Sequence, residues 1–214
     1  MILCSSKNLT LPKPEESFFS DLLVVGGGCS GLAAISAAAD LGIENSIILE
    51  KEEKLGGRLG KSTEGINGLF AKTVQPKELL SHFSLFLENY GIAHQEGVEV
   101  EELYLLSGEE ALSIAHSQGE ASAYRYLLKA KTKEGERFFI SKAFVLATGV
   151  LTPEENAAVS TLIEEDRKTG SPGLFLAGQS LAPAQSIAEA VQSGGAVGRR
   201  VGEMLLKEKH KQGF

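Results

Sequence analysis

The sequence predicts an α/β fold in which a mainly parallel sheet is covered by helices. Short apolar runs recur along the chain, as expected for strands buried on both faces. Alanine-rich or amphipathic segments with helical spacing lie between several of them. The chain has 214 residues, 43% of them hydrophobic and 23% charged, which suffices for a sizeable core.

The first predicted elements form a strand–helix–strand unit. A strand over residues 22–25 precedes an alanine-rich helix over 30–41, and Gly42 stands where a glycine commonly ends a helix. A second buried strand is expected over 46–50. This order is typical of a βαβ unit, which joins two parallel strands.

The middle of the chain adds a loop, a helix and a small antiparallel meander. Residues 51–70 are rich in glycine and polar residues and are expected to form a loop. A helix over 76–90 begins at a proline and ends before Gly91. The strands of the meander are expected over 97–106, 124–132 and 137–141, with a turn at 133–136.

The last third of the chain returns to buried strands. One is expected over 143–147 and another over 174–177, and residues 152–168 between them are expected to be partly helical. A long helix follows over 186–206. No linker divides the chain, so we expect one domain over 21–207, preceded by an arm over 1–20 and followed by a tail over 208–214.

Composition excludes several classes of partner and location. The net charge of −7 argues against nucleic acid and against an anionic membrane surface. Cys4 and Cys29 form no CxxC pair, so a reducing compartment is the default. The N-terminus lacks the pattern of a signal peptide, and no stretch is long enough to span a membrane. We therefore expect a cytoplasmic protein.

A glycine motif, Gly26-x-Gly28-x-x-Gly31, lies between the first strand and the first helix. The first glycine permits a tight turn, the second lets the backbone approach a pyrophosphate, and the third lets helix and strand pack closely. The helix N-terminus then offers free N–H groups to the phosphates. Glu50 ends the next strand, where a carboxylate suits a ribose diol and disfavours a 2′-phosphate. These features predict a Rossmann-type unit that binds FAD or NAD.

Four segments together resemble the FAD domain of the thioredoxin reductase-like flavoproteins, which have two dinucleotide-binding domains. They are VVGGGCSGLAA, ILEKEEKLGGRL, VLATG and PGLFLAGQS, and the resemblance extends over residues 21–204. It implies that Gly56-Gly57 lies along the pyrophosphate and ribityl, that Thr148-Gly149 closes a strand against the cofactor, and that Gly178 carries the chain to the flavin. NAD-only dehydrogenases have no equivalent of this late motif, so the resemblance favours FAD. It also implies a Rossmann-like FAD-binding fold, a parallel sheet with helices plus a small antiparallel β-meander.

Two departures from this family matter. The family usually has Asp after the late Ala-Gly, where this chain has Gln179, whose amide can still bond a ribityl hydroxyl. The family also carries a nicotinamide-binding domain between the ATG strand and the late motif. Only residues 150–172 fill that interval here, without a second glycine motif and without the redox-active CxxC. The nicotinamide domain is therefore expected to be absent.

Several further residues belong to the predicted site. Cys29 is expected to be a small buried residue near the phosphates, and Arg58 either meets the pyrophosphate or lies in a solvated loop. Gln185 and Ser186 stand at the start of the last helix, near the expected flavin N1 and O2, where an N-cap role is also open. The predicted cofactor-binding residues are Gly26, Gly28, Cys29, Ser30, Gly31, Glu50, Lys51, Gly57, Arg58, Thr148, Gly149, Gly178, Gln179, Gln185, Ser186 and Ile187.

Other charged residues have simpler interpretations. The four histidines show no metal-ligand spacing, so no metal site is expected. The acidic run at 99–102 and the acidic cluster at 164–166 are expected to face solvent. No residue stands out as a catalytic acid, base or nucleophile, so the catalytic residues stay unassigned.

These observations favour a single-domain, FAD-dependent oxidoreductase that takes electrons from a diffusing donor or from a partner protein. Two alternatives stay open: a non-catalytic FAD-binding subunit or sensor, and a thiazole-synthase-like protein that uses NAD. An exposed flavin edge would favour a homodimer that covers it, although no motif fixes the oligomeric state.

Overall fold

The computed structural model describes residues 3–4, 11–69, 72–115, 123–170, 172–182 and 185–211. Its strands are β1 (Leu3–Cys4), β2 (Ser17–Val25), β3 (Ser46–Glu50), β4 (Ala93–Glu96), β5 (Glu99–Leu105), β6 (Tyr126–Thr132), β7 (Gly135–Leu146) and β8 (Leu174–Leu176). Its α-helices are α1 (Cys29–Ala39), α2 (Arg58–Lys61), α3 (Pro76–Asn89), α4 (Gly108–Ala115), α5 (Pro153–Lys168) and α6 (Ile187–Lys211). Two 3₁₀ turns lie at Pro14–Glu16 and Gly178–Ser180.

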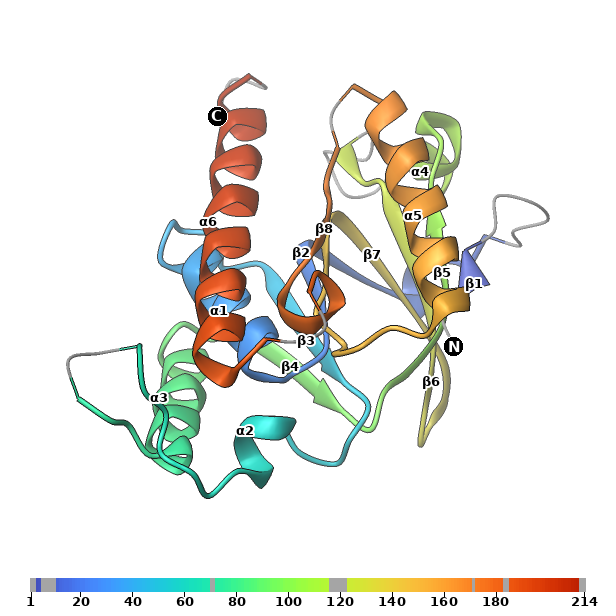
Figure 1. Cartoon of the computed structure of the whole chain (residues 1–214). Helices are drawn as coiled ribbons and strands as arrows, with labels where there is room; N and C mark the ends of the chain where they lie inside the picture. The colour runs from blue at the N-terminus through green and yellow to red at the C-terminus, as the bar shows by residue number, and fades with distance from the viewer. Residues whose placement is uncertain are drawn as a thin grey trace.

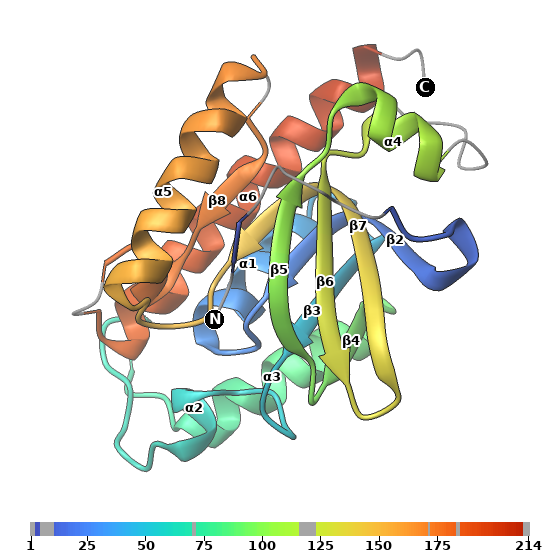
Figure 2. The same cartoon turned by 90° about the vertical axis from the view of Figure 1, so that its right-hand side faces the viewer.

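The strands form one sheet in the order β1-β5-β6-β7-β2-β3-β4, with β8 paired to β7 off this path. The pairs β7–β2, β2–β3 and β3–β4 are parallel, and β5–β6 and β6–β7 are antiparallel. This arrangement confirms the predicted fold class, a parallel sheet with helices and a small antiparallel meander. Figures 1 and 2 show the meander at one side of the sheet and helices α1, α3 and α6 at the other.

Two apolar layers hold the sheet. On one face Leu22 and Val24 of β2 pack in a cluster with Leu32 and Ile35 of α1 and with residues of α3 and α6. On the opposite face, the neighbouring side chains of β2 pack with residues of β5, β6, β7 and α5. The alternation places successive residues of β2 on opposite faces, and both faces are buried.

Helices α1 and α6 approach each other through glycine. A methyl group added at Gly194 would collide with the carbonyl oxygen of Ser30, and one added at Gly198 with that of Ala34. Small residues at these positions let the two backbones come close, and the N-terminal half of α6 therefore lies against the first turns of α1. This contact brings the late part of the chain to the glycine motif.

The structure corrects several predicted boundaries. The strand expected at 22–25 begins at Ser17, inside the predicted N-terminal arm. The strands expected at 137–141 and 143–147 are the single strand β7. Lys142 joins these two stretches. Its Nζ lies 3.0 Å from Asp21 Oδ1, and each side chain is only 8% exposed. This pairing lets a charged residue continue through a buried strand.

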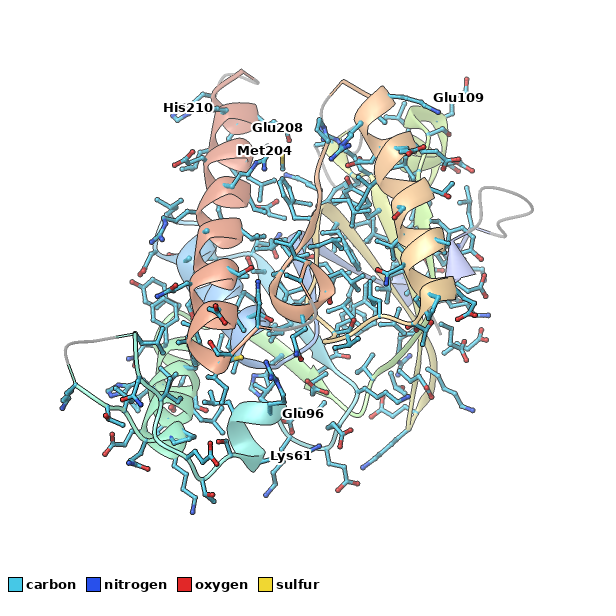
Figure 3. All side chains as sticks on the ribbon, in the orientation of Figure 1. Lys61, Glu96, Glu109, Met204, Glu208 and His210 are labelled. Atoms are coloured by element: carbon cyan, nitrogen blue, oxygen red, sulfur yellow. The ribbon has the colours of Figure 1, made fainter. Side chains whose placement is uncertain are left out.

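The helix predicted over 186–206 is longer in the structure, where α6 extends to Lys211. Glu208 Oε1 lies 2.6 Å from Arg125 Nη2, and Lys209 Nζ lies 3.1 Å from Asp21 Oδ2. Figure 3 shows Glu208 on the side of α6 that faces the rest of the molecule. These ion pairs join the last turns to the sheet. Residues 212–214 lie outside the described residues.

Several elements were missing from the prediction. β1, β4 and α4 were not expected, and the predicted loop at 51–70 contains the short helix α2. β4 is a polar edge strand of four residues with little hydrophobic alternation, which explains why its pattern was missed.

Candidate functional site

A cleft of 390 Å³ lies at the carboxyl ends of β2 and β3, the position at which open α/β sheets bind ligands. Eleven of the sixteen predicted cofactor-binding residues line it. They are Gly26, Gly28, Cys29, Ser30, Glu50, Lys51, Gly57, Arg58, Thr148, Gly149 and Gln179. The structure therefore gathers residues from across most of the chain around one cleft.

The three motif glycines have different surroundings. Gly26 has φ 107°, and a methyl group there would collide with the carbonyl oxygen of Ala147. A methyl group at Gly31 would collide with the carbonyl oxygen of Gly26. At Gly28 an added methyl group would meet no atom of the described chain within 4 Å. Gly26 and Gly31 are thus required by packing, and Gly28 leaves open space on the cleft side of the loop.

Helix α1 begins in the cleft. Gly28 is its N-cap and provides no side-chain cap, so the N–H groups of the first turn are available to an anion. The positive end of the helix dipole adds to this preference. A pyrophosphate beside Gly28 would fit this end of the cleft.

Glu50 is held firmly at the end of β3. Its Oε2 accepts a hydrogen bond from the Gly27 N–H at 2.7 Å, and its Oε1 accepts one from the Glu52 N–H at 2.8 Å. The residue is 7% exposed and lines the cleft. Because each carboxylate oxygen can accept more than one hydrogen bond, the group can still receive those of a ribose diol.

The neighbouring residue Lys51 lines this end of the cleft and forms an ion pair across it. Its Nζ lies 2.7 Å from Glu99 Oε1 at the start of β5. The hydrogen bond between them raises the pKa of the Lys51 ammonium and lowers the pKa of the Glu99 carboxyl. Val98 and Val100 flank Glu99 in the cleft wall and provide apolar surface for a flat base.

The second glycine pair is joined directly to the phosphate loop. The Gly56 N–H donates to the Gly27 carbonyl oxygen at 2.8 Å, and Gly28 forms a parallel bridge with Gly56. Gly57 has φ 49°, and a methyl group there would lie 3.2 Å from the Cα of Gly28. Both glycines are therefore needed for this approach between two segments of the backbone.

The late motif reaches the same place through different contacts. Gly178 has φ 61°, and a methyl group there would collide with the side chain of Ser30. Its N–H donates to Ser193 Oγ at 3.1 Å, and the Ser180 hydroxyl donates to the Gly149 carbonyl oxygen at 2.9 Å. These bonds tie the late motif to α6 and to the Thr148-Gly149 segment, and they bring Gln179 into the cleft wall.

Five predicted residues do not line the cleft: Gly31, Gly178, Gln185, Ser186 and Ile187. Gly31 and Gly178 act at packing contacts. Ser186 caps α6, because its Oγ accepts from the Glu189 N–H at 3.3 Å while Glu189 Oε2 accepts from the Ser186 N–H at 2.8 Å. Direct cofactor contact by these five residues stays a prediction.

Arg58 lies nearer to the last helix than expected. Its Nη2 donates to the carbonyl oxygen of Gln185 at 3.1 Å, which joins the second glycine segment to the residue just before Ser186. Arg58 also lines the cleft. Its guanidinium thus lies between the cleft and the start of α6, where the resemblance places the pyrimidine end of a flavin.

Cys29 is 5% exposed and packs with Leu59, Ile66 and Ala188. Burial raises the pKa of its thiol, and the nearby charge of Arg58 offsets only part of this rise. A buried thiol with a raised pKa is a poor nucleophile at neutral pH. This environment agrees with the interpretation of Cys29 as a small packing residue.

Sequence reasoning missed several residues of the cleft wall: Lys61, Val98, Glu99, Val100 and Glu155. Glu155 had a readable signal, since Thr152 and Glu155 form a capping box at the start of α5. Val98 and Val100 had none, because only the fold brings the start of β5 beside Glu50.

Metal binding and membrane insertion have no support in the described residues. Among the described residues, no cluster of three or more His, Cys, Asp or Glu side chains could hold a metal ion. In the same part of the chain, every helix is too short or too polar to cross a membrane.

The fold and the cleft together define a dinucleotide-binding protein, and the comparisons specify the cofactor. Residues 21–89 match a family model described as the FAD binding domain. This segment contains the glycine motif, Glu50 and the second glycine pair, so the match confirms the prediction that FAD is the cofactor. A comparison with curated proteins found no match.

Solved structures confirm the fold. A thioredoxin reductase from Gloeobacter violaceus superimposes with a TM-score of 0.59 at 14% identity, over 90% of this chain and 97% of that chain. THI4 from Thermovibrio ammonificans superimposes with a TM-score of 0.53 at 18% identity, over 90% of each chain. The fold is that of the FAD domain of the thioredoxin reductase-like flavoproteins, as the sequence segments predicted.

Other similar structures are longer. The bacillithiol disulfide reductase from Bacillus cereus gives a TM-score of 0.45 at 16% identity over 61% of this chain, and this chain spans 40% of its length.

Proposed function

We propose that the chain is a single-domain, FAD-dependent oxidoreductase whose electrons come from a diffusing donor or from a partner protein. One observation carries this proposal. The interval in which thioredoxin reductase-like flavoproteins carry a nicotinamide domain is occupied here by α5, a helix of 16 residues. Its residues Val159 and Leu162 are buried in the core beneath the sheet. The interval is therefore part of the FAD-binding domain itself.

The residues of the cleft support binding and orientation. The first turn of α1 is suited to the pyrophosphate, Glu50 to the ribose and the wall at Val98–Val100 to the adenine. FAD supplies the electron-transfer chemistry when bound, and the protein contributes position and electrostatics. The positive Arg58 side chain and the N-terminus of α6 would favour negative charge at the pyrimidine end of a reduced flavin.

Anaerobic titration of the FAD-loaded protein tests this proposal. Dithionite should bleach the flavin band and establish that the cofactor can be reduced. At least one biological donor, either NADH, NADPH or a reduced protein donor such as a ferredoxin, should then bleach the band rapidly. Partner identity, homodimer formation and cytoplasmic location remain predictions from the sequence.

The same titration distinguishes the alternatives. Reduction by dithionite with no response to any biological donor would favour a non-catalytic FAD-binding subunit or sensor. A colourless protein that retains NAD would favour a thiazole-synthase-like use of NAD. Rapid bleaching by NADH would identify NADH as the diffusing donor.

A further inference from the structure

A second, larger cavity lies behind the phosphate loop. It is a groove of 770 Å³ between α3 and the edge strand β4. Its apolar floor consists of Leu55, Leu80, Leu87 and Ile92. Leu87 and Ile92 are 2% and 4% exposed and belong to the main core, so the floor is a fixed surface.

The side chains of Leu55 and Leu80 form a wall between the groove and the cofactor cleft. The side chain of Leu55 leaves no room for a methyl group at Gly27, and that of Leu80 lies 3.0 Å from the position of one at Gly56. Glu96 Oε1 accepts a hydrogen bond from the Leu55 N–H at 2.8 Å and anchors this wall to β4. Figure 3 shows Glu96 close to α2, at the same end of the molecule as Lys61. The groove is thus a separate site on the other side of the wall.

The two ends of the groove differ in charge. At one end the positive Lys54 is accompanied by the Glu96 carboxylate, which accepts the hydrogen bond from the Leu55 N–H, so the two charges offset each other. At the other end, Glu88 and Gly91 mark the C-terminus of α3. The last turn of this 14-residue helix contains no basic residue. The negative end of its dipole and the Glu88 carboxylate therefore both favour a cation.

We propose that this groove binds a small organic cation, with its ammonium group beside Glu88 at the end of α3 and its hydrocarbon body over the partly exposed side chain of Leu80. The apolar floor accounts for the hydrocarbon body, and the charge at the end of α3 accounts for the sign of the polar group. A carboxylate ligand would instead have to approach Lys54 at the opposite end. The proposal is independent of electron transfer and of FAD binding.

Two probes of the same size and opposite charge test the proposal: phenethylammonium and phenylacetate. Each is titrated calorimetrically into the full-length protein, with and without FAD. Phenethylammonium should bind with a stoichiometry of one in both cases, about tenfold more tightly than phenylacetate. Equal binding of the two probes, or loss of phenethylammonium binding when FAD is added, would overturn the proposal.

Three variants locate the bound probe. Glu88→Gln removes the charge at the end of α3 and should weaken phenethylammonium about fivefold. Ser84→Trp places a large ring in the groove from an exposed position and should abolish binding while leaving the thermal unfolding midpoint unchanged. Glu109→Gln on α4, well removed from the groove in Figure 3, is the matched control and should bind the probe like the natural chain. Full binding by the Ser84→Trp variant would contradict the assignment.

Discussion

The cofactor cleft and the junction between α5, β6 and β8 use opposite means to hold the chain together. In the cleft, backbone meets backbone, and glycine at Gly26 and Gly31 permits the contact. At the junction, side chains meet in the buried interior: Asp166 Oδ1 accepts from the Tyr126 hydroxyl at 2.6 Å, and Asp166 Oδ2 accepts from the N–H groups of Gly173 and Leu174 at 2.9 and 3.0 Å. The cleft thus depends on the absence of side chains at two glycines, and the junction depends on the hydrogen bonds of one carboxylate.

This junction corrects the prediction that residues 164–166 face solvent. Asp166 is fully buried, although Glu164 beside it is exposed. Burial and the bond to Asp166 raise the pKa of the Tyr126 hydroxyl, which therefore stays protonated and serves as a donor. The junction fixes the start of β8, the strand that leads to Gly178 and Gln179.

The largest effect is expected from a pair of substitutions in the phosphate loop. Gly31→Ala should lower the free energy of unfolding by about 3 kcal/mol, because the added methyl group collides with the Gly26 carbonyl oxygen. Gly28→Val should lower that free energy by only about 1 kcal/mol, the cost of replacing glycine at the N-cap, but remove FAD binding, because its side chain enters open space on the cleft side. Urea unfolding and FAD titration of both variants measure the difference. Equal stability of the two variants would contradict the account of the loop.

Substitutions at the junction between α5, β6 and β8 should lower the free energy of unfolding without changing the affinity for FAD. Asp166→Ala leaves the Tyr126 hydroxyl and the Leu174 N–H without their acceptor, while the Gly173 N–H keeps the Tyr126 hydroxyl oxygen, and should cost about 3 kcal/mol. Tyr126→Phe keeps the ring and should cost about 1 kcal/mol. Both variants should bind FAD with the affinity of the natural chain wherever they are folded, as fluorescence titration would show. A large loss of FAD affinity in folded Tyr126→Phe would mean that the junction also shapes the cleft.

The difference between the cleft and the junction also explains which parts of the fold and the site the sequence could predict. The parallel strands and the phosphate loop have local signals, namely apolar runs and glycines at fixed spacing. The same is true of Glu50, because it directly follows a predicted strand. Asp166 has no such signal, since its partner Tyr126 lies 40 positions away and its neighbours are acidic.

The wall of the cleft was only partly predictable for the same reason. Lys51 follows Glu50 and was expected, but its partner Glu99 was assigned to a solvated run. The path of β5 alone brings Glu99, Val98 and Val100 to the cleft. Likewise the role of Lys142 within β7 becomes clear only when Asp21 of the neighbouring strand is known.

A smaller effect is expected at the end of α6. Lys209→Ala removes an ion pair whose lysine is 38% exposed, and it should cost about 0.5 kcal/mol. Asp21→Asn should cost about 3 kcal/mol, because it removes the carboxylate that lies 3.0 Å from the Nζ of the buried Lys142. Thermal unfolding of the two variants gives the ranking. Equal effects would show that Lys142 does not depend on Asp21.

The smallest effect concerns alkaline pH. Burial, with the hydrogen bond to Glu102, raises the pKa of Tyr104 to about 12 from its ordinary 10.0. The protonated hydroxyl is therefore favoured in the folded state, and its contribution to stability is complete below pH 10 and is lost as the pH rises to 12. Tyr104→Phe should unfold with a weaker pH dependence in this interval, as a series of urea titrations would measure. An unchanged slope would exclude Tyr104 as the source.

The central claim is that the cleft at the end of β2 binds FAD, and equilibrium titration of the purified protein tests it most directly. The natural chain should bind one FAD, quench its fluorescence and keep it in the presence of excess NAD, whereas Gly28→Val should fold without binding it. A natural chain that stays colourless with FAD and binds NAD instead, or a Gly28→Val variant that binds FAD normally, would contradict the account.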